Sequence, residues 1–150
     1  MCILTWVINM NNQDFLSTLL KTTQTSQVQI RRILDNAMDP SLRSSLKKHL
    51  LEYDAAETEA LSIALQRGWD LKHLDPVFRF LVDFIIRCQL KGRRSDSKIA
   101  EVMIRRNTSA MIHGLRNLHK YTDKDHRIRI LAQKILDCET ANIRQLQGYL

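Results

Sequence analysis

The scarcity of helix-breaking residues constrains this fold more than any other feature of the sequence. Only four glycines and two prolines occur among 150 residues. These residue types most often interrupt regular structure, so their scarcity favours long helices joined by short turns. Hydrophobic residues make up 44% of the chain and charged residues 26%, which is enough apolar material for one globular core. We therefore expect a single all-α domain.

The few breakers and capping residues also mark where the helices begin and end. Asp39-Pro40 and Asp75-Pro76 each combine an N-cap aspartate with a proline in the first helical position. Gly68 supplies the stop for the helix that begins at Pro40. The stretch from Thr122 to Asp125 has capping-box spacing, which predicts that Thr122 opens the last helix. The predicted helices cover residues 14–37, 40–67, 76–90 and 97–121, followed by a fifth helix that includes residues 128–146.

The lengths of these helices predict how they pack. Four are long, whereas helix 76–90 is short and apolar nearly all round. A short third helix that runs back along the bundle makes the second and fourth helices parallel. That is the one-crossover arrangement of ferritin-like bundles. The predicted fold is therefore an all-α, ferritin-like antiparallel four-helix bundle with a short fifth crossover helix.

Each long helix carries a polar residue near the middle of its apolar stripe. In helix 40–67 the apolar positions recur at helical spacing, and Glu57 falls near the centre of their stripe. If the helices form a bundle, such breaks stack into one buried polar layer. A buried carboxylate is costly unless it is paired, liganded or protonated. The expected members of the layer are Ser26, Glu57, Asn107, Glu139 and Asn142, with Tyr53 as a further hydrogen-bonding partner.

This layer has the composition of a reduced di-metal site. Ferritin-like di-metal sites use one Glu from each of two helices and Glu-x-x-His from each of the other two. Glu139-Thr-Ala-Asn142 has the spacing of Glu-x-x-His but ends in an amide, and the predicted stripes contain no histidine. We therefore interpret the layer as a hydrogen-bonded network that fixes helix register, with no catalytic residue and no cofactor. The alternatives are one divalent metal ion held by Glu57 and Glu139, or a small ligand in the same layer.

The histidines and cysteines are expected to lie outside the layer. His113 is predicted on the flank of its helix that it shares with Arg106, at the surface or at the boundary of the core. His49 belongs to no metal-binding pattern and is expected to be solvated. The three cysteines are odd in number and far apart, which predicts no disulfide framework and fits a reducing cytoplasm. Cys138 is interpreted as a buried, inert thiol.

The net charge of +7 is interpreted as that of a soluble basic bundle, with nucleic acid or an anionic surface as the alternative partner. The candidate basic patch consists of Arg93, Arg94, Arg105 and Arg106. No aromatic residues alternate with these arginines to stack on bases. We therefore do not expect nucleic acid as a partner, and a basic nucleic-acid or anionic-surface binder stands as a second alternative function.

Two apolar segments bear on membranes and on partner proteins. The opening segment is too short to span a bilayer and lacks the basic residues and the cleavage site of a signal peptide. We expect residues 1–12 to form a loosely ordered extension before a domain at 13–150, and translation from Met10 would remove residues 1–9. No transmembrane segment is predicted. The apolar circumference of helix 76–90 is interpreted as packing of the crossover helix, with a homodimer interface as the alternative.

Several segments resemble a group of small bacterial ferritin-like proteins of uncharacterised function. The similar segments are Ser97–Ile104, Asn107–Met111, Glu139–Leu150 and Leu51–Asp54. The resemblance covers roughly residues 13–150, and its motifs are loose helical patterns. It implies a ferritin-like bundle, and it brings no established activity or ligand set.

Overall fold

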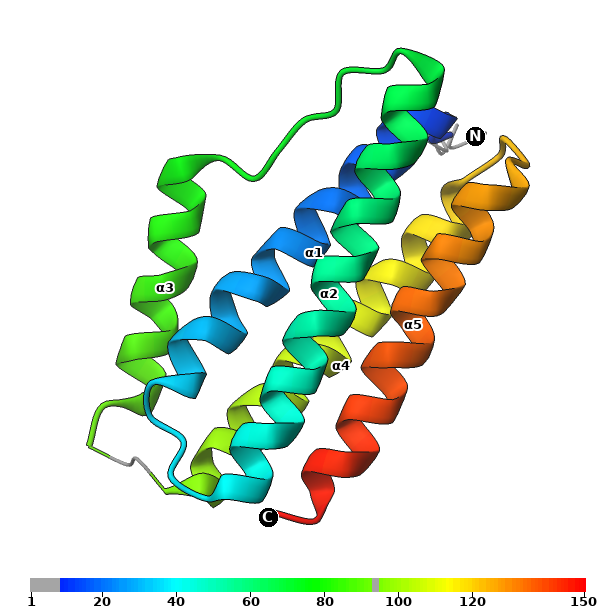
Figure 1. The fold of residues 1–150 in the computed structure, drawn as a ribbon. Coiled ribbons are helices and arrows are strands. Elements are labelled where there is room, and N and C mark those ends of the chain that lie inside the picture. The colour runs from blue at the N-terminus through cyan, green and yellow to red at the C-terminus, as the bar shows by residue number, and fades with distance from the viewer. Residues whose placement is uncertain (1–8, 93–94) are drawn as a thin grey trace, which may run out of the picture.

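The computed structural model describes residues 9–92 and 95–150, and within these ranges the chain forms five α-helices and no sheet. The all-α prediction is confirmed. Residues 1–8 of the predicted extension, and Arg93 and Arg94 of the predicted basic patch, lie outside the described residues. The helices are α1 (Asn12–Leu34), α2 (Pro40–Arg67), α3 (Pro76–Leu90), α4 (Asp96–Lys120) and α5 (His126–Gln147) (Figure 1).

The two Asp-Pro pairs begin α2 and α3, and Gly68 ends α2, where the sequence predicts. The Asp39 carboxylate accepts a hydrogen bond from the backbone N–H of Leu42, and Asp75 caps α3 in the same way. Gly68 ends α2 in the left-handed conformation, with φ of 67°. Local capping chemistry accounts for these boundaries, and the Asp96 carboxylate of α4 also accepts from the backbone N–H groups of Met38 and Asp39.

Two predicted boundaries are wrong. α1 ends at Leu34, three residues before the predicted Ala37. α5 is capped by Asp125, whose carboxylate accepts from the N–H of Ile128, and not by Thr122. The backbone N–H of Thr122 instead donates to the carbonyl of Met10. The capping-box spacing was present, but pairing with a distant segment holds Thr122 outside the helix.

The helices pack as two antiparallel hairpins with an outer helix (Figure 1). α1 pairs with α2, α4 pairs with α5, and α2 also packs against α5. After α2, the segment 69–75 crosses to α3, which lies outside the hairpins against α1. α3 returns the chain to the end at which α2 began, so α2 and α4 run in the same direction. No helix among the described residues is long and apolar enough to cross a membrane.

The apolar core has two main clusters, one toward each end of the bundle. One cluster contains Phe15 from the start of α1 and Ile63 from the end of α2. The other contains Ile33 from the end of α1 and Leu46 from the first half of α2. The buried polar residues near the midpoints of the helices lie between these clusters.

Residues just before α1 are tied to the connection between α4 and α5. The Met10 N–H donates to the carbonyl of Lys120 over 3.0 Å. One turn into α1, the Phe15 ring stacks on the Tyr121 ring with centroids 4.4 Å apart. Met10 is therefore held against the connection between α4 and α5.

Candidate functional site

Five polar side chains from four helices are buried near the middle of the bundle. Their backbone positions are set by the helical periodicity that places them on the inward faces of α1, α2, α4 and α5. All five are among the residues that the sequence predicts for the polar layer. They are Ser26, Tyr53, Asn107, Glu139 and Asn142.

Glu139 and Tyr53 form the centre of this layer. The Tyr53 hydroxyl donates a hydrogen bond of 2.6 Å to Oε1 of Glu139, and both residues are only 1% exposed. Burial raises the pKa of Glu139 to about 7, although the hydrogen bond from Tyr53 acts to lower it. Burial and the neighbouring Glu139 charge hold the pKa of Tyr53 well above its usual range, and the Ser26 hydroxyl lies beside it. The carboxyl of Glu139 therefore gains or loses its proton near neutral pH.

Three buried polar atoms of the layer have no hydrogen-bond partner among the described residues. They are Oε2 of Glu139, Nδ2 of Asn107 and Nδ2 of Asn142. Glu139 and Asn142 lie one turn apart on α5, and the contact between Thr140 and Met111 fixes the level of α4 beside them. The atoms are of complementary type, since a carboxylate oxygen accepts and an amide nitrogen donates. Each of these atoms could form a hydrogen bond with a polar molecule such as water.

Glu57 does not join this layer as predicted. It is half-buried and is not among the fully buried polar residues. The buried positions of α2 on either side of it are Tyr53 and Ala60, so Glu57 lies at the edge of the apolar stripe. The layer consequently contains one fully buried carboxylate, Glu139, in place of the predicted pair. Among the described residues no group of three or more His, Cys, Asp or Glu side chains is placed to hold a metal ion.

A second buried polar contact was missed because His49 was expected to be solvated. His49 is buried on α2, and its Nε2 lies 3.0 Å from Oε1 of Gln145 on α5. The amide of Gln145 donates in turn to the Ser45 hydroxyl over 2.9 Å. Burial lowers the pKa of His49. Its spacing from Leu46 and Tyr53 places it on the apolar stripe, and that signal was available in the sequence.

Cys138 lies beside the layer and has the properties of an unreactive thiol. It is half-buried. Burial, together with the nearby carboxylate of Glu52, raises its pKa to about 11. The thiolate is the nucleophilic form, so this environment opposes reactivity. The interpretation of Cys138 as an inert thiol is supported, although the residue is less buried than predicted.

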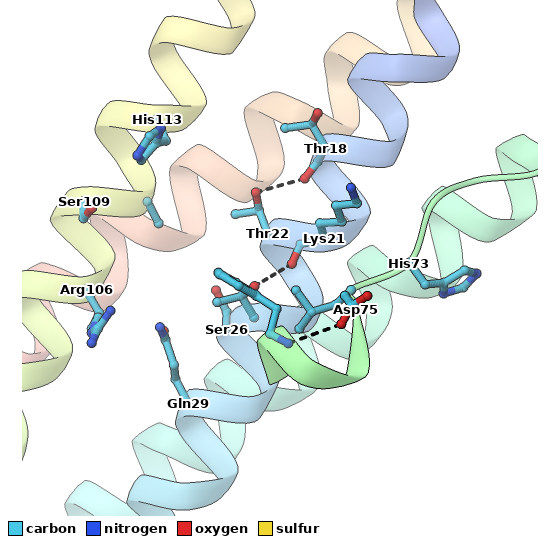
Figure 2. A pocket seen from close by; sticks show the side chains of 14 residues that line it. Thr18, Lys21, Thr22, Ser26, Gln29, His73, Asp75, Arg106, Ser109 and His113 are labelled. Atoms are coloured by element: carbon cyan, nitrogen blue, oxygen red, sulfur yellow. Dashed lines mark hydrogen bonds between the residues drawn. The ribbon is translucent and has the colours of Figure 1, made fainter. Parts of the chain in front are cut away.

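A cleft of about 540 Å³ opens between α1 and α4, with the first turn of α3 at its side (Figure 2). Figure 2 shows Arg106, Ser109 and His113 on the α4 wall, facing the side chains of α1. His113 and Arg106 therefore share one flank of α4, as predicted. Ser26 reaches both this cleft and the buried Tyr53 hydroxyl. Sequence reasoning identified neither the cleft nor its lining, because it depends on how closely α1 and α4 approach.

The described part of the predicted basic patch does not form one surface. Arg105 pairs with Glu101 on the same helix, with the two atoms 3.0 Å apart. Arg106 turns toward the α1–α4 cleft and donates to Gln89 of α3 over 3.3 Å. The two neighbouring arginines thus have different surroundings.

The comparisons with known proteins give no match, so the function is inferred from the geometry of the structure. No protein-family model matches the sequence, and no curated protein and no solved structure matches it. The resemblance to small bacterial ferritin-like proteins remains an expectation that rests on the sequence segments alone.

Proposed function

We propose that this protein is a non-catalytic, ferritin-like helical bundle that acts by binding other protein chains. Its polar layer is then a remnant of a di-metal layer that now specifies helix register. Support for the ferritin-like topology comes from the two helical hairpins and from the shared direction of α2 and α4 (Figure 1). A crossover connection between hairpins produces that relation.

The observation that carries the proposal is the composition of the layer. Four helices contribute a hydroxyl, a phenol, two amides and a single fully buried carboxylate. A di-metal centre requires several carboxylates and imidazoles at that level. Within the layer, the Tyr53 hydroxyl donates a hydrogen bond to Glu139, which joins α2 to α5. Sliding one helix by a turn would bury these groups against apolar side chains, so the layer favours one register.

The outer face of α3 is the proposed binding surface. It consists of Val77, Phe80, Leu81 and Phe84, which are between 47% and 76% exposed. Their spacing of three and four residues forms a continuous apolar stripe on the outside of the helix. The opposite face of α3, with Val82, Ile86 and Leu90, is buried. α3 is therefore apolar on two sides, and only one of them is covered within the chain.

A second copy of the chain is the partner that fits this stripe. The stripe contains no charged residue, so two copies can pair about a two-fold axis without burying a charge. α3 itself is anchored by the Arg32 guanidinium, which donates two hydrogen bonds to the Asp83 carboxylate at 2.6 and 3.1 Å. The surface is thus presented on a fixed helix.

A Phe80→Glu/Phe84→Glu variant tests the proposed dimer. We expect the native chain to sediment as a dimer at micromolar concentrations. The variant should sediment as a monomer, because a dimer would bury two charges from each chain at the interface. Sedimentation-velocity ultracentrifugation measures this difference. Leu51→Glu, at an exposed leucine of α2, is the matched control and should leave the dimer intact. A native chain that remains monomeric at every accessible concentration contradicts the proposed partner.

Metal analysis tests the non-catalytic interpretation against metal binding at Glu139. The unpartnered Oε2 of Glu139 is the observation that favours this second candidate. If the layer only specifies register, protein purified without an affinity tag should contain far less than one metal ion per chain. Glu139→Ala should leave that content unchanged. Iron, manganese or zinc at one ion per chain, lost in Glu139→Ala, would show that the layer still binds metal.

A further inference from the structure

We propose that the cleft between α1 and α4 binds a small anionic molecule with a flat apolar body, of the class of aromatic phosphates and carboxylates. The cleft lining includes Phe78 of α3 but none of the four residues of the proposed dimer surface, so this inference does not rest on the proposed dimer. Three features of the lining carry it: two cations that form no ion pair with a carboxylate of the described residues, an exposed aromatic side chain, and a difference in polar groups between the two walls (Figure 2).

The charge of the lining is positive on both walls. Lys21 comes from α1 and Arg106 from α4, and both are half-buried. Neither forms an ion pair with a carboxylate in residues 9–92 or 95–150. The acid of the lining is Asp75, whose Oδ1 already accepts from the N–H groups of Val77 and Phe78 at the start of α3. A half-buried cation attracts an anion more strongly than a solvated one, because water screens it less.

The apolar part of the lining lies between the two helices. Phe78, from the first turn of α3, is 48% exposed and lines the cleft together with Leu74 and Ala110. An exposed aromatic ring inside a cleft offers a face on which another ring can stack. Leu74 is held by the Gln24 side chain, which accepts from the Leu74 N–H over 2.7 Å. The apolar floor is therefore attached to α1 and is not a free loop.

The polar groups that the two walls present to the cleft differ, and this difference orients the ligand. On α1, Thr18, Thr22 and Thr25 donate to backbone carbonyls four residues earlier, so they present acceptor oxygens to the cleft. Acceptors repel an anionic group. Among the described residues, the Arg106 guanidinium of α4 forms one hydrogen bond, to Gln89, and its other N–H groups match phosphate and carboxylate oxygens. The anionic group should therefore lie toward Arg106, with Lys21 adding charge from the opposite wall and the flat body against Phe78.

Titration with phenyl phosphate tests the site in the intact chain. We expect saturable binding of one molecule per chain by calorimetry, with shifts of the NMR amide signals of the α1 and α4 walls. Inorganic phosphate, which lacks the ring, and phenol, which lacks the charge, should each bind more weakly. Binding should also weaken as salt is raised.

Two matched variants separate a specific site from the general positive charge. Arg106→Ala should weaken phenyl phosphate binding at least about tenfold, the factor that corresponds to one lost charge-assisted contact. Arg105→Ala removes the same charge from the neighbouring position but not from the cleft, and it should leave the affinity unchanged. Circular dichroism melts confirm that both variants are folded.

Three results would overturn the proposal. The first is the absence of saturable binding to the native chain. The second is an equal loss of phenyl phosphate affinity in Arg105→Ala and Arg106→Ala, which would mean that binding depends only on the net charge of the chain. The third is a set of amide-signal shifts confined to the outer face of α3, which would place the ligand outside the cleft. This measurement needs no variant.

Discussion

Glu139→Gln is expected to stabilise the protein by roughly 3 kcal/mol at about pH 8 and to change its stability little at about pH 5. Burial raises the pKa of Glu139 from 4.5 to about 7. Between these values the folded chain holds the proton more tightly than the unfolded chain does, so native stability falls as the pH rises through this window. Above it the native fold holds a buried carboxylate at full cost, whereas glutamine carries no charge at any pH and still accepts from Tyr53.

Urea unfolding of the native chain and the variant at the two pH values measures this difference. Glu57→Gln is the matched control, because Glu57 is the acid that the sequence placed in the same layer and the structure leaves half-buried. It should change the free energy of unfolding by less than about 0.5 kcal/mol at either pH. Equal stabilisation by the two variants, or a native stability that does not fall between the two pH values, would contradict the assigned role of Glu139.

Phe15→Ala is expected to destabilise the protein by about 3–5 kcal/mol, the usual range for removing a fully buried phenylalanine. Phe15 is completely buried in the first turn of α1 and stacks on Tyr121 at the end of α4. The substitution leaves a cavity and also removes an aromatic pair, which contributes about 0.5–1.5 kcal/mol beyond burial. The effect should be equally large at both pH values, because neither ring is charged there.

Thermal or urea unfolding of Phe15→Ala provides the measurement. Leu65→Ala, at an exposed leucine near the end of α2, controls for the loss of an apolar side chain outside the core. That control should change stability by no more than about 0.5 kcal/mol. A loss below about 1 kcal/mol in Phe15→Ala would mean that the start of α1 contributes little to the folded state.

Local chemistry and helical periodicity made most of the fold predictable from the sequence. The Asp-Pro pairs and Gly68 define helix ends through caps within a few residues, and the structure confirms them. The burial of Asn107 and Glu139 follows from their spacing relative to apolar neighbours. Thr122 shows the limit of such signals, since a long-range backbone hydrogen bond to Met10 overrides its capping pattern.

The parts of the candidate site that were not predicted depend on contacts between helices. Glu57 and His49 lie on the same helix near the same apolar stripe, yet His49 is buried and Glu57 is not. The neighbouring helix determines which edge of an apolar stripe is buried. Here Gln145 of α5 lies against His49. The α1–α4 cleft depends in the same way on the position of α3 and on the distance between two helices that are remote in sequence.

The separation of the apolar core into two clusters affects which substitutions the protein can accumulate during evolution. Side chains such as Ile63 and Leu46 belong to different clusters, with the Glu139 layer between them. A larger side chain in one cluster can therefore be offset by its own neighbours, without any adjustment at the other end. The two ends of the bundle can thus diverge independently, because the polar layer around Glu139 separates their apolar side chains.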